Sequence, residues 1–310
     1  MSLVVNHNLM AMNAARNLST AYGKLGVSTR RLSSGLRVGT AADDAAGLAI
    51  RELMRADIAA LNQGIRNAND AISLIQTADG ALQVIDEKLI RMKELAEQAA
   101  TGTYTSDQRL IIDSEYQAMA SEITRIANAT DFNGIYLLNG NLSAGTSHLD
   151  QSAWYNDHNG AGLTPTGPLK IHFGTGNDSA EDYYYIAIQT ATASAFGLGN
   201  AAASGAAGYT ISTQSAAQAA LNQINEAIVS KDKIRAALGA LQNRLENTIT
   251  NLQIQAENLQ AAESRISDVD VATEMTEFVR NQILTQSAVA MLAQANSLPR
   301  MAMQLIGGGA

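Results

Sequence analysis

The segment MRADIAALNQGIRNANDAISLI, residues 54–75, decides the fold of this chain. Seven of its apolar residues are spaced alternately four and three apart, which places them along one face of an α-helix. They are Met54, Ile58, Leu61, Ile65, Ala68, Ile72 and Ile75. Because such a stripe is buried when a second helix packs along it, the segment predicts a long helix in coiled-coil packing.

The same spacing recurs toward both ends of the sequence, and further blocks of it cover residues 78–99, 112–126 and 221–259. The two terminal stripes are Ala14, Leu18, Ala21, Leu25, Ser28 and Leu32 near the N-terminus, and Leu284, Ala288, Met291, Ala295, Leu298, Ala302 and Leu305 near the C-terminus. Ser28 is the one polar member of its stripe. We interpret it as a residue that sets helix register or close packing.

The middle of the chain, from about residue 139 to residue 215, has a different composition. It is rich in Gly, Ser, Thr and Asn and contains the single Trp, Trp154. Leu169–Phe173 and Tyr183–Ile188 are predicted to be two short strands, and the polar segment between them is typical of a hairpin turn. The predicted fold is therefore mainly α, with long helices from both chain ends in coiled-coil or bundle packing and a small β-hairpin region in the middle.

Two positions indicate where the helices break. Thr40 followed by Asp43 matches a capping box, in which the hydroxyl accepts from an early helix N–H and the carboxylate reaches back. We therefore predict a helix cap and a domain boundary near residue 40. The apolar phase of the C-terminal helices changes at Ser267 and Asp268, which predicts the matching boundary there.

The composition excludes several classes of function. The formal charge of −8 argues against nucleic acid and against an anionic membrane surface as partners. Without cysteine there are no disulfides and no thiol chemistry. No apolar run approaches the ~20 residues that span a bilayer. Residues 1–18 lack the features of a cleavable signal peptide, so signal rules alone predict a protein that stays inside the cell.

No group of residues makes a convincing catalytic or cofactor site. Asp43 and Asp44 are better explained by helix capping than as a pair of catalytic carboxylates. His148 and His158 lie near acidic residues, but none of the histidines forms a helical i, i+4 pair, so the sequence gives little support for a metal site. The sequence therefore predicts no enzyme and no cofactor.

Pattern alone leaves the state of assembly open. A chain can pair its own two ends and remain a monomeric helical bundle. Alternatively, the remaining apolar faces can contact neighbouring copies, and head-to-tail contacts that do not close produce a helical filament.

Several motifs in one order resemble the bacterial flagellins. In the first half they are RLSSGLR (31–37), AADDAAGLAI (41–50), RNAND (66–70), TADGAL (77–82) and DFNG (131–134). In the second half they are LGALQNR (238–244), SRISD (264–268), ATE (272–274) and LAQAN (292–296). The resemblance covers roughly residues 1–140 and 215–306.

The resemblance implies a layered subunit. Residues 1–40 and 268–310 would pair as the coiled coil of an inner tube, with Leu18, Leu25, Leu32 and the C-terminal stripe packing it. Residues 41–140 and 215–267 would form an outer tube of helices. Residues 141–214 would be a variable surface region that carries the hairpin at about 169–188.

The resemblance also implies partners and a location. Such a subunit polymerises with its own copies into an extracellular flagellar filament used for motility. It leaves the cell unfolded through the flagellar type III system, without a cleaved signal peptide, and folds on assembly. A chaperone holds the C-terminal arm during export, and filament cap and hook-junction proteins contact the polymer.

One further site transfers from the resemblance. Arg91, Leu95, Gln98 and Glu115 match positions that the vertebrate Toll-like receptor for flagellin recognises, a surface that also serves subunit packing in the family. Two other functions stay open at this point. One is a hook–filament junction protein, which shares the terminal helices, and the other is an enzyme carried on a flagellin scaffold.

Overall fold

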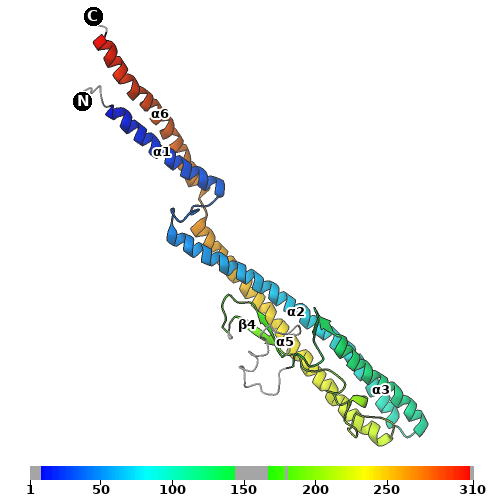
Figure 1. The fold of residues 1–310 in the computed structure, drawn as a ribbon. Coiled ribbons are helices and arrows are strands. Elements are labelled where there is room, and N and C mark those ends of the chain that lie inside the picture. Colours follow the sequence, from blue (N-terminus) through cyan, green and yellow to red (C-terminus); the bar gives the residue numbers. More distant parts are fainter. Residues whose placement is uncertain (1–7, 144–166, 179–180, 308–310) are drawn as a thin grey trace. The chain divides into compact units, whose positions relative to one another are not determined.

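A computed structural model describes residues 8–143, 167–178 and 181–307 (Figure 1). Its long helices are α1 (Leu9–Ser34), α2 (Ala45–Ala100), α3 (Ser106–Ala129), α5 (Gln214–Ser267) and α6 (Val271–Gly307). The chain divides into two compact units, which we call the terminal unit (Met1–Ile58 with Glu257–Ala310) and the middle unit (Ala59–Ala256). The mainly helical fold class predicted from the sequence is confirmed.

The terminal unit is built on α1 and α6, which run antiparallel side by side (Figure 1). At one end the Asn8 side chain donates to the Ala295 carbonyl at 2.8 Å. The same Asn8 caps α1 by accepting from the Ala11 N–H at 3.0 Å, which satisfies an otherwise free helix donor. Gly35 ends α1 with φ of 71°, a left-handed conformation that glycine adopts without steric cost.

The connection from α1 to α2 pairs with the connection from α5 to α6. The Arg37 N–H donates to the Ser267 carbonyl at 2.6 Å, and the Val269 N–H donates to the Gly35 carbonyl at 3.0 Å. Arg51 in the first turns of α2 is buried and donates to the Val38 carbonyl at 2.6 Å. The helices therefore break near residues 35–44 and 268–270, close to the positions where the sequence places boundaries.

The cap of α2 differs from the prediction. The helix begins at Ala45, and Asp44 caps it by accepting from the Gly47 N–H at 2.9 Å. The Thr40 hydroxyl donates to the Asp43 carboxylate at 2.9 Å, and the Thr40 N–H also donates to that carboxylate. The predicted cap at Thr40 and Asp43 is therefore wrong: these residues close a turn that precedes the helix.

The middle unit packs α2, α3 and α5 around one apolar core. The buried side chains of α2 keep the four–three spacing of a coiled-coil seam, with Ala71, Ala78, Ile85, Met92 and Ala99 alternating with Ala68, Ile75, Leu82, Leu89 and Ala96. Thr105 begins α3 with a complete capping box to Gln108.

Two small antiparallel hairpins lie in this unit. Strands β3 (Leu169–His172) and β4 (Tyr183–Ile186) pair Leu169 with Ile186 and His172 with Tyr183, so the predicted hairpin is confirmed. Strands β1 (Asp131–Phe132) and β2 (Ile135–Tyr136) were not predicted. Their turn is Asn133-Gly134 with φ of 53° and 80°, the combination that favours tight hairpins.

Residues 186–211 were predicted to belong to a variable surface region, but they form part of the core. Ile186, Ile188, Leu198 and Ile211 are fully buried with the helices. The segment contains the 3₁₀ turn η1 (Gly199–Ala201), and the buried Tyr116 hydroxyl of α3 donates to the Gly208 carbonyl at 2.9 Å. The surface assignment is wrong for these residues because their apolar side chains complete the cover of α3 and α5.

Within the described ranges, no helix has both the length and the apolar character that crossing a bilayer demands.

Candidate assembly surface on the terminal helices

Small and polar residues form the seam between α1 and α6, the line along which the two helices face each other. Ala21 and Ser28 of α1 are buried there, and so are Asn281, Thr285 and Ala295 of α6. Small side chains let the two backbones approach closely. Polar groups at such positions fix register at some cost in stability, which is the role predicted for Ser28.

The predicted packing residues of α1 lie beside this seam. Leu18, Leu25 and Leu32 are half-buried, so each is covered on one side only. The larger apolar residues of α1 are more exposed still, with Met10 and Met12 among them.

The predicted stripe of α6 divides between the seam and the exposed flank beside it. Ala288 is half-buried and Ala295 is buried, whereas Leu284 is 50% exposed and Met291 is 63% exposed. The side chains of Leu298 and Leu305 lie outside the described part of the structure. Two stripes with the same four–three spacing share positions 288 and 295 on this helix, and the one facing α1 runs through Asn281 and Thr285. The predicted stripe leaves its large apolar side chains, Leu284 and Met291, exposed to solvent.

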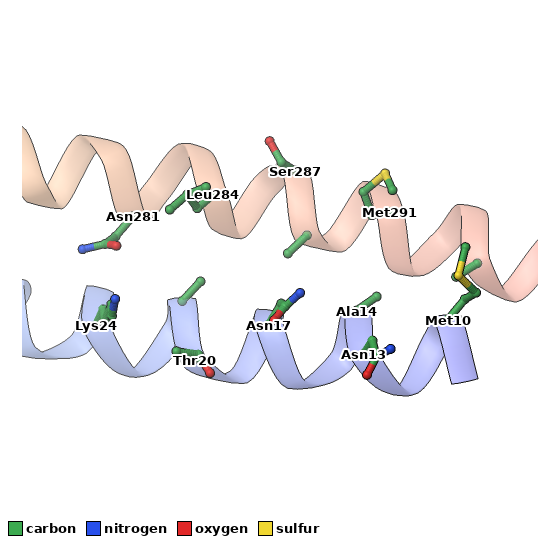
Figure 2. Close-up of a pocket in the computed structure, with 13 residues that line it drawn as sticks. Met10, Asn13, Ala14, Asn17, Thr20, Lys24, Asn281, Leu284, Ser287 and Met291 are labelled. Carbon is green, nitrogen blue, oxygen red and sulfur yellow. The ribbon is translucent and has the colours of Figure 1, made fainter. Parts of the chain in front are cut away.

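A groove of about 510 Å³ runs between the two helices (Figure 2). The wall from α1 is mixed, with the polar Asn13, Asn17, Thr20 and Lys24 beside the apolar Met10, Ala14 and Ala21, and the other wall comes from α6. On that second wall Leu284 and Met291 are the large apolar residues. The groove therefore presents apolar area together with a cation to whatever covers it.

Charge is distributed unevenly over this unit. Helix α1 carries four basic residues and no acidic one: Arg16, Lys24, Arg30 and Arg31. Arg31 lies 3.5 Å from Glu274 of α6, and Arg30 lies 2.8 Å from Asp43. The Thr40 hydroxyl, with further help from Arg30, lowers the pKa of Asp43 below its ordinary value. These contacts join the end of α1 to α6 and to the connection before α2.

The predicted receptor residues fall into two groups. Arg91 donates to Glu115 at 2.8 Å and to Glu94 at 3.0 Å on the surface, and these bonds, that to Glu115 first, raise its pKa. Gln98 is also exposed and donates to the Tyr104 hydroxyl at 3.0 Å. Leu95 is only 2% exposed and belongs to the core of the middle unit. Of the four predicted receptor residues, only Arg91, Gln98 and Glu115 can contact a receptor on a single copy, because Leu95 is buried.

Sequence reasoning missed a buried charge in the middle unit. The Lys231 ammonium lies 2.5 Å from Asp86 of α2, and Arg235 lies 2.6 Å from Asp79. The sequence contained a signal, because the predicted apolar stripe of α5 has no member between Ile228 and Ile234. Continuing the four–three spacing from Ile224 through position 227 places residue 231 on the seam.

The part of the chain that the structure describes contains no cluster of three or more His, Asp or Glu suited to a metal ion. His148 and His158, the candidates from the sequence, lie outside the described residues.

A chain that pairs its two ends as helices and leaves large apolar side chains outward has the organisation of a structural subunit. Comparison with known families identifies the kind. Residues 5–143 match the bacterial flagellin N-terminal helical region, and residues 221–306 match the bacterial flagellin C-terminal helical region. The chain belongs to the bacterial flagellin family.

Similar proteins match along nearly their whole length. A flagellin of Halalkalibacterium halodurans is 41% identical over 304 residues, covering 98% of this chain and 100% of the relative. The flagellar filament 33 kDa core protein of Treponema phagedenis is 39% identical with the same coverage. The solved structure of a putative flagellar hook-associated protein from Vibrio parahaemolyticus has a TM-score of 0.54 at 15% identity, covering 73% of this chain and 100% of that chain. At that identity the likeness extends to the fold alone.

Proposed function

We propose that this chain is a structural subunit that polymerises with its own copies into an extracellular flagellar filament. The outward face of α6 is the observation that carries the proposal. Leu284 and Met291 remain half-exposed or more although α1 covers the seam beside them on the same helix. Such a face gains free energy when a neighbouring copy covers it.

Polymerisation is coupled to ordering of the arms in this proposal. Amphipathic helices need a partner to offset the conformational entropy lost on ordering. The α1–α6 pair of one copy leaves Leu284 and Met291 exposed, so in this proposal its seam alone does not offset that entropy. The arms are then largely disordered in the free subunit and become ordered when neighbouring copies cover them. Export in an unfolded state through the type III system, with a chaperone on the C-terminal arm, fits the same property. The cap and hook-junction proteins contact the growing polymer.

Seeded growth tests the proposed function. Purified subunits are mixed with short filament fragments and followed by sedimentation and electron microscopy. Long filaments of uniform diameter are expected. Growth limited to a short cap on each seed would instead support the junction-protein alternative, which shares the terminal helices.

Recognition by a vertebrate Toll-like receptor is a second proposal, supported by the exposed Arg91–Glu115 pair. Arg91→Ala removes a surface charge without opening the core, unlike Leu95→Ala. Receptor signalling by the monomeric variant is expected to fall. Arg125→Ala, at another exposed ion pair, is the matched control and should signal normally. Equal signalling by both variants would refute the proposal.

A further inference from the structure

Lys231 occupies an unusual position in the middle unit. Its side chain is 3% exposed on the face of α5 that packs against α2, in line with the buried Ile224, Ile234 and Leu238. Its ammonium contacts Asp86 at 2.5 Å and its own neighbour Asp232 at 2.8 Å. A charged group on an apolar seam destabilises the pair unless it meets its counter-charge, so it discriminates between alignments of the two helices.

A second pair lies one heptad along α2 from the first. Arg235 donates to both carboxylate oxygens of Asp79, at 2.6 and 3.2 Å. These hydrogen bonds lower the pKa of Asp79, so the carboxylate is fully charged at neutral pH. The two contacts show that α2 and α5 run antiparallel, with residue 231 opposite residue 86 and residue 235 opposite residue 79.

Slipping α5 by one heptad keeps one ion pair and loses the other. One slip sets Arg235 opposite Asp86, but it brings Lys231 opposite Lys93 and leaves Asp79 without its arginine. The other sets Lys231 opposite Asp79, but it places Arg235 opposite Ile72 and Asp86 opposite Ile224. Only the native alignment satisfies both cations and both carboxylates. The apolar seam alone discriminates poorly between these alignments, because its four–three spacing repeats every seven residues.

We propose that Lys231 and Arg235 of α5 select the native register of α2 and α5. They do so through attraction to Asp86 and Asp79 of α2 and through repulsion between Lys231 and Lys93 in one slipped alignment. A one-heptad slip displaces the surface of α5 along α2 by about 10 Å, since an α-helix rises 1.5 Å per residue. Copies in different registers present different outer faces and cannot occupy equivalent positions in a helical polymer. This consequence for growth rests on the proposed function, whereas the register itself is a property of the single chain.

Spin labels measure the register directly. The chain contains no cysteine, so Glu87→Cys and Asn243→Cys, both at exposed positions, attach one label to each helix of the full-length subunit. Pulsed electron–electron double resonance is expected to give a single distance between the two labels in the parent chain. Lys231→Met with Asp86→Met removes the buried pair while keeping apolar volume, and a second distance displaced by about 10 Å is expected.

A surface substitution gives the same test without touching the core. Lys93 is exposed, and Lys93→Asp supplies Lys231 with a carboxylate in the slipped alignment, where Arg235 meets Asp86. The second distance is expected here too. Arg66→Asp makes the same charge change outside that heptad row and should keep a single distance.

A single native distance in both the Lys231→Met/Asp86→Met chain and the Lys93→Asp chain overturns the proposal. If the first variant does not fold, as judged by circular dichroism, the Lys93→Asp result decides alone. The measurement is made on monomers, so a parent chain that fails to grow on seeds counts against the proposed function and leaves the register result standing.

Discussion

Shortening Met291 to Ala tests whether the outward face of α6 holds copies together. Met291 is 63% exposed in the single chain, so its loss leaves the α1–α6 seam intact. Alanine is a better helix former than methionine, and the isolated helix should not suffer. Any loss of polymer stability then comes from contacts between copies.

The size of the effect follows from the exposed fraction. Complete burial of a methionine side chain stabilises by about 1.5–3 kcal/mol, so covering the exposed part contributes about 1–2 kcal/mol. Because 1.4 kcal/mol is a factor of ten in an equilibrium constant, we expect the critical concentration for growth to rise about five- to thirtyfold.

The assay is seeded growth at a series of subunit concentrations, with the soluble fraction measured after sedimentation. Gln286→Ala, at an exposed polar position of the same helix, is the control and should leave the critical concentration unchanged. An unchanged critical concentration for Met291→Ala, with filaments of normal appearance, would refute the reasoning.

Three further predictions concern the arms, the hairpin and the ion pairs. A chain ending at Ser267 should stay soluble and helical by circular dichroism but show no seeded growth in sedimentation; filaments would count against the account. Gly64→Ala places a Cβ 2.0 Å from the Phe173 carbonyl oxygen, and urea unfolding should show a loss of about 1–3 kcal/mol, whereas no loss would mean that the hairpin does not pack there. Arg235 lowers the pKa of Asp79, so the stability from this pair is present above the unfolded pKa of about 4 and is lost as pH falls through the lower folded pKa. Asp79→Asn should therefore reduce the difference in urea stability between pH 7 and pH 3, and an unaltered difference would contradict this.

Apolar periodicity was sufficient to predict the helices and one hairpin. Leu61, Ala68 and Ile75 of the predicted stripe lie in the buried seam of α2, whereas Met54, Ile58, Ile65 and Ile72 are only half-buried. The predicted strands at 169 and 183 pair as β3 and β4. In both cases the spacing of side chains is a local property, fixed by helix or strand geometry whatever the rest of the chain does.

The prediction failed where a choice depends on a partner. Helix α6 carries two stripes with the same spacing, and the choice between them depends on how α1 packs against it, which places Asn281 and Thr285 inward. Lys231 was left out of the α5 seam because a charge is expected at the surface, while its burial depends on Asp86, distant in sequence.

The errors at the start of α2 and at the first hairpin came from local sequence signals that were present but misinterpreted. Asp44 is an equally good cap residue as Thr40 and stands directly before the helix, whereas Thr40 and Asp43 satisfy each other. Asn133-Gly134 is a strong hairpin signal that was read only as part of a family motif.

Hydrogen exchange of the two arms before and after polymerisation tests the central claim most directly. In the free subunit the amides of α1 and α6 are expected to exchange almost as fast as an unfolded chain, and in seeded filaments they are expected to become strongly protected. Arms that are already protected in a subunit that does not grow on seeds would contradict the account.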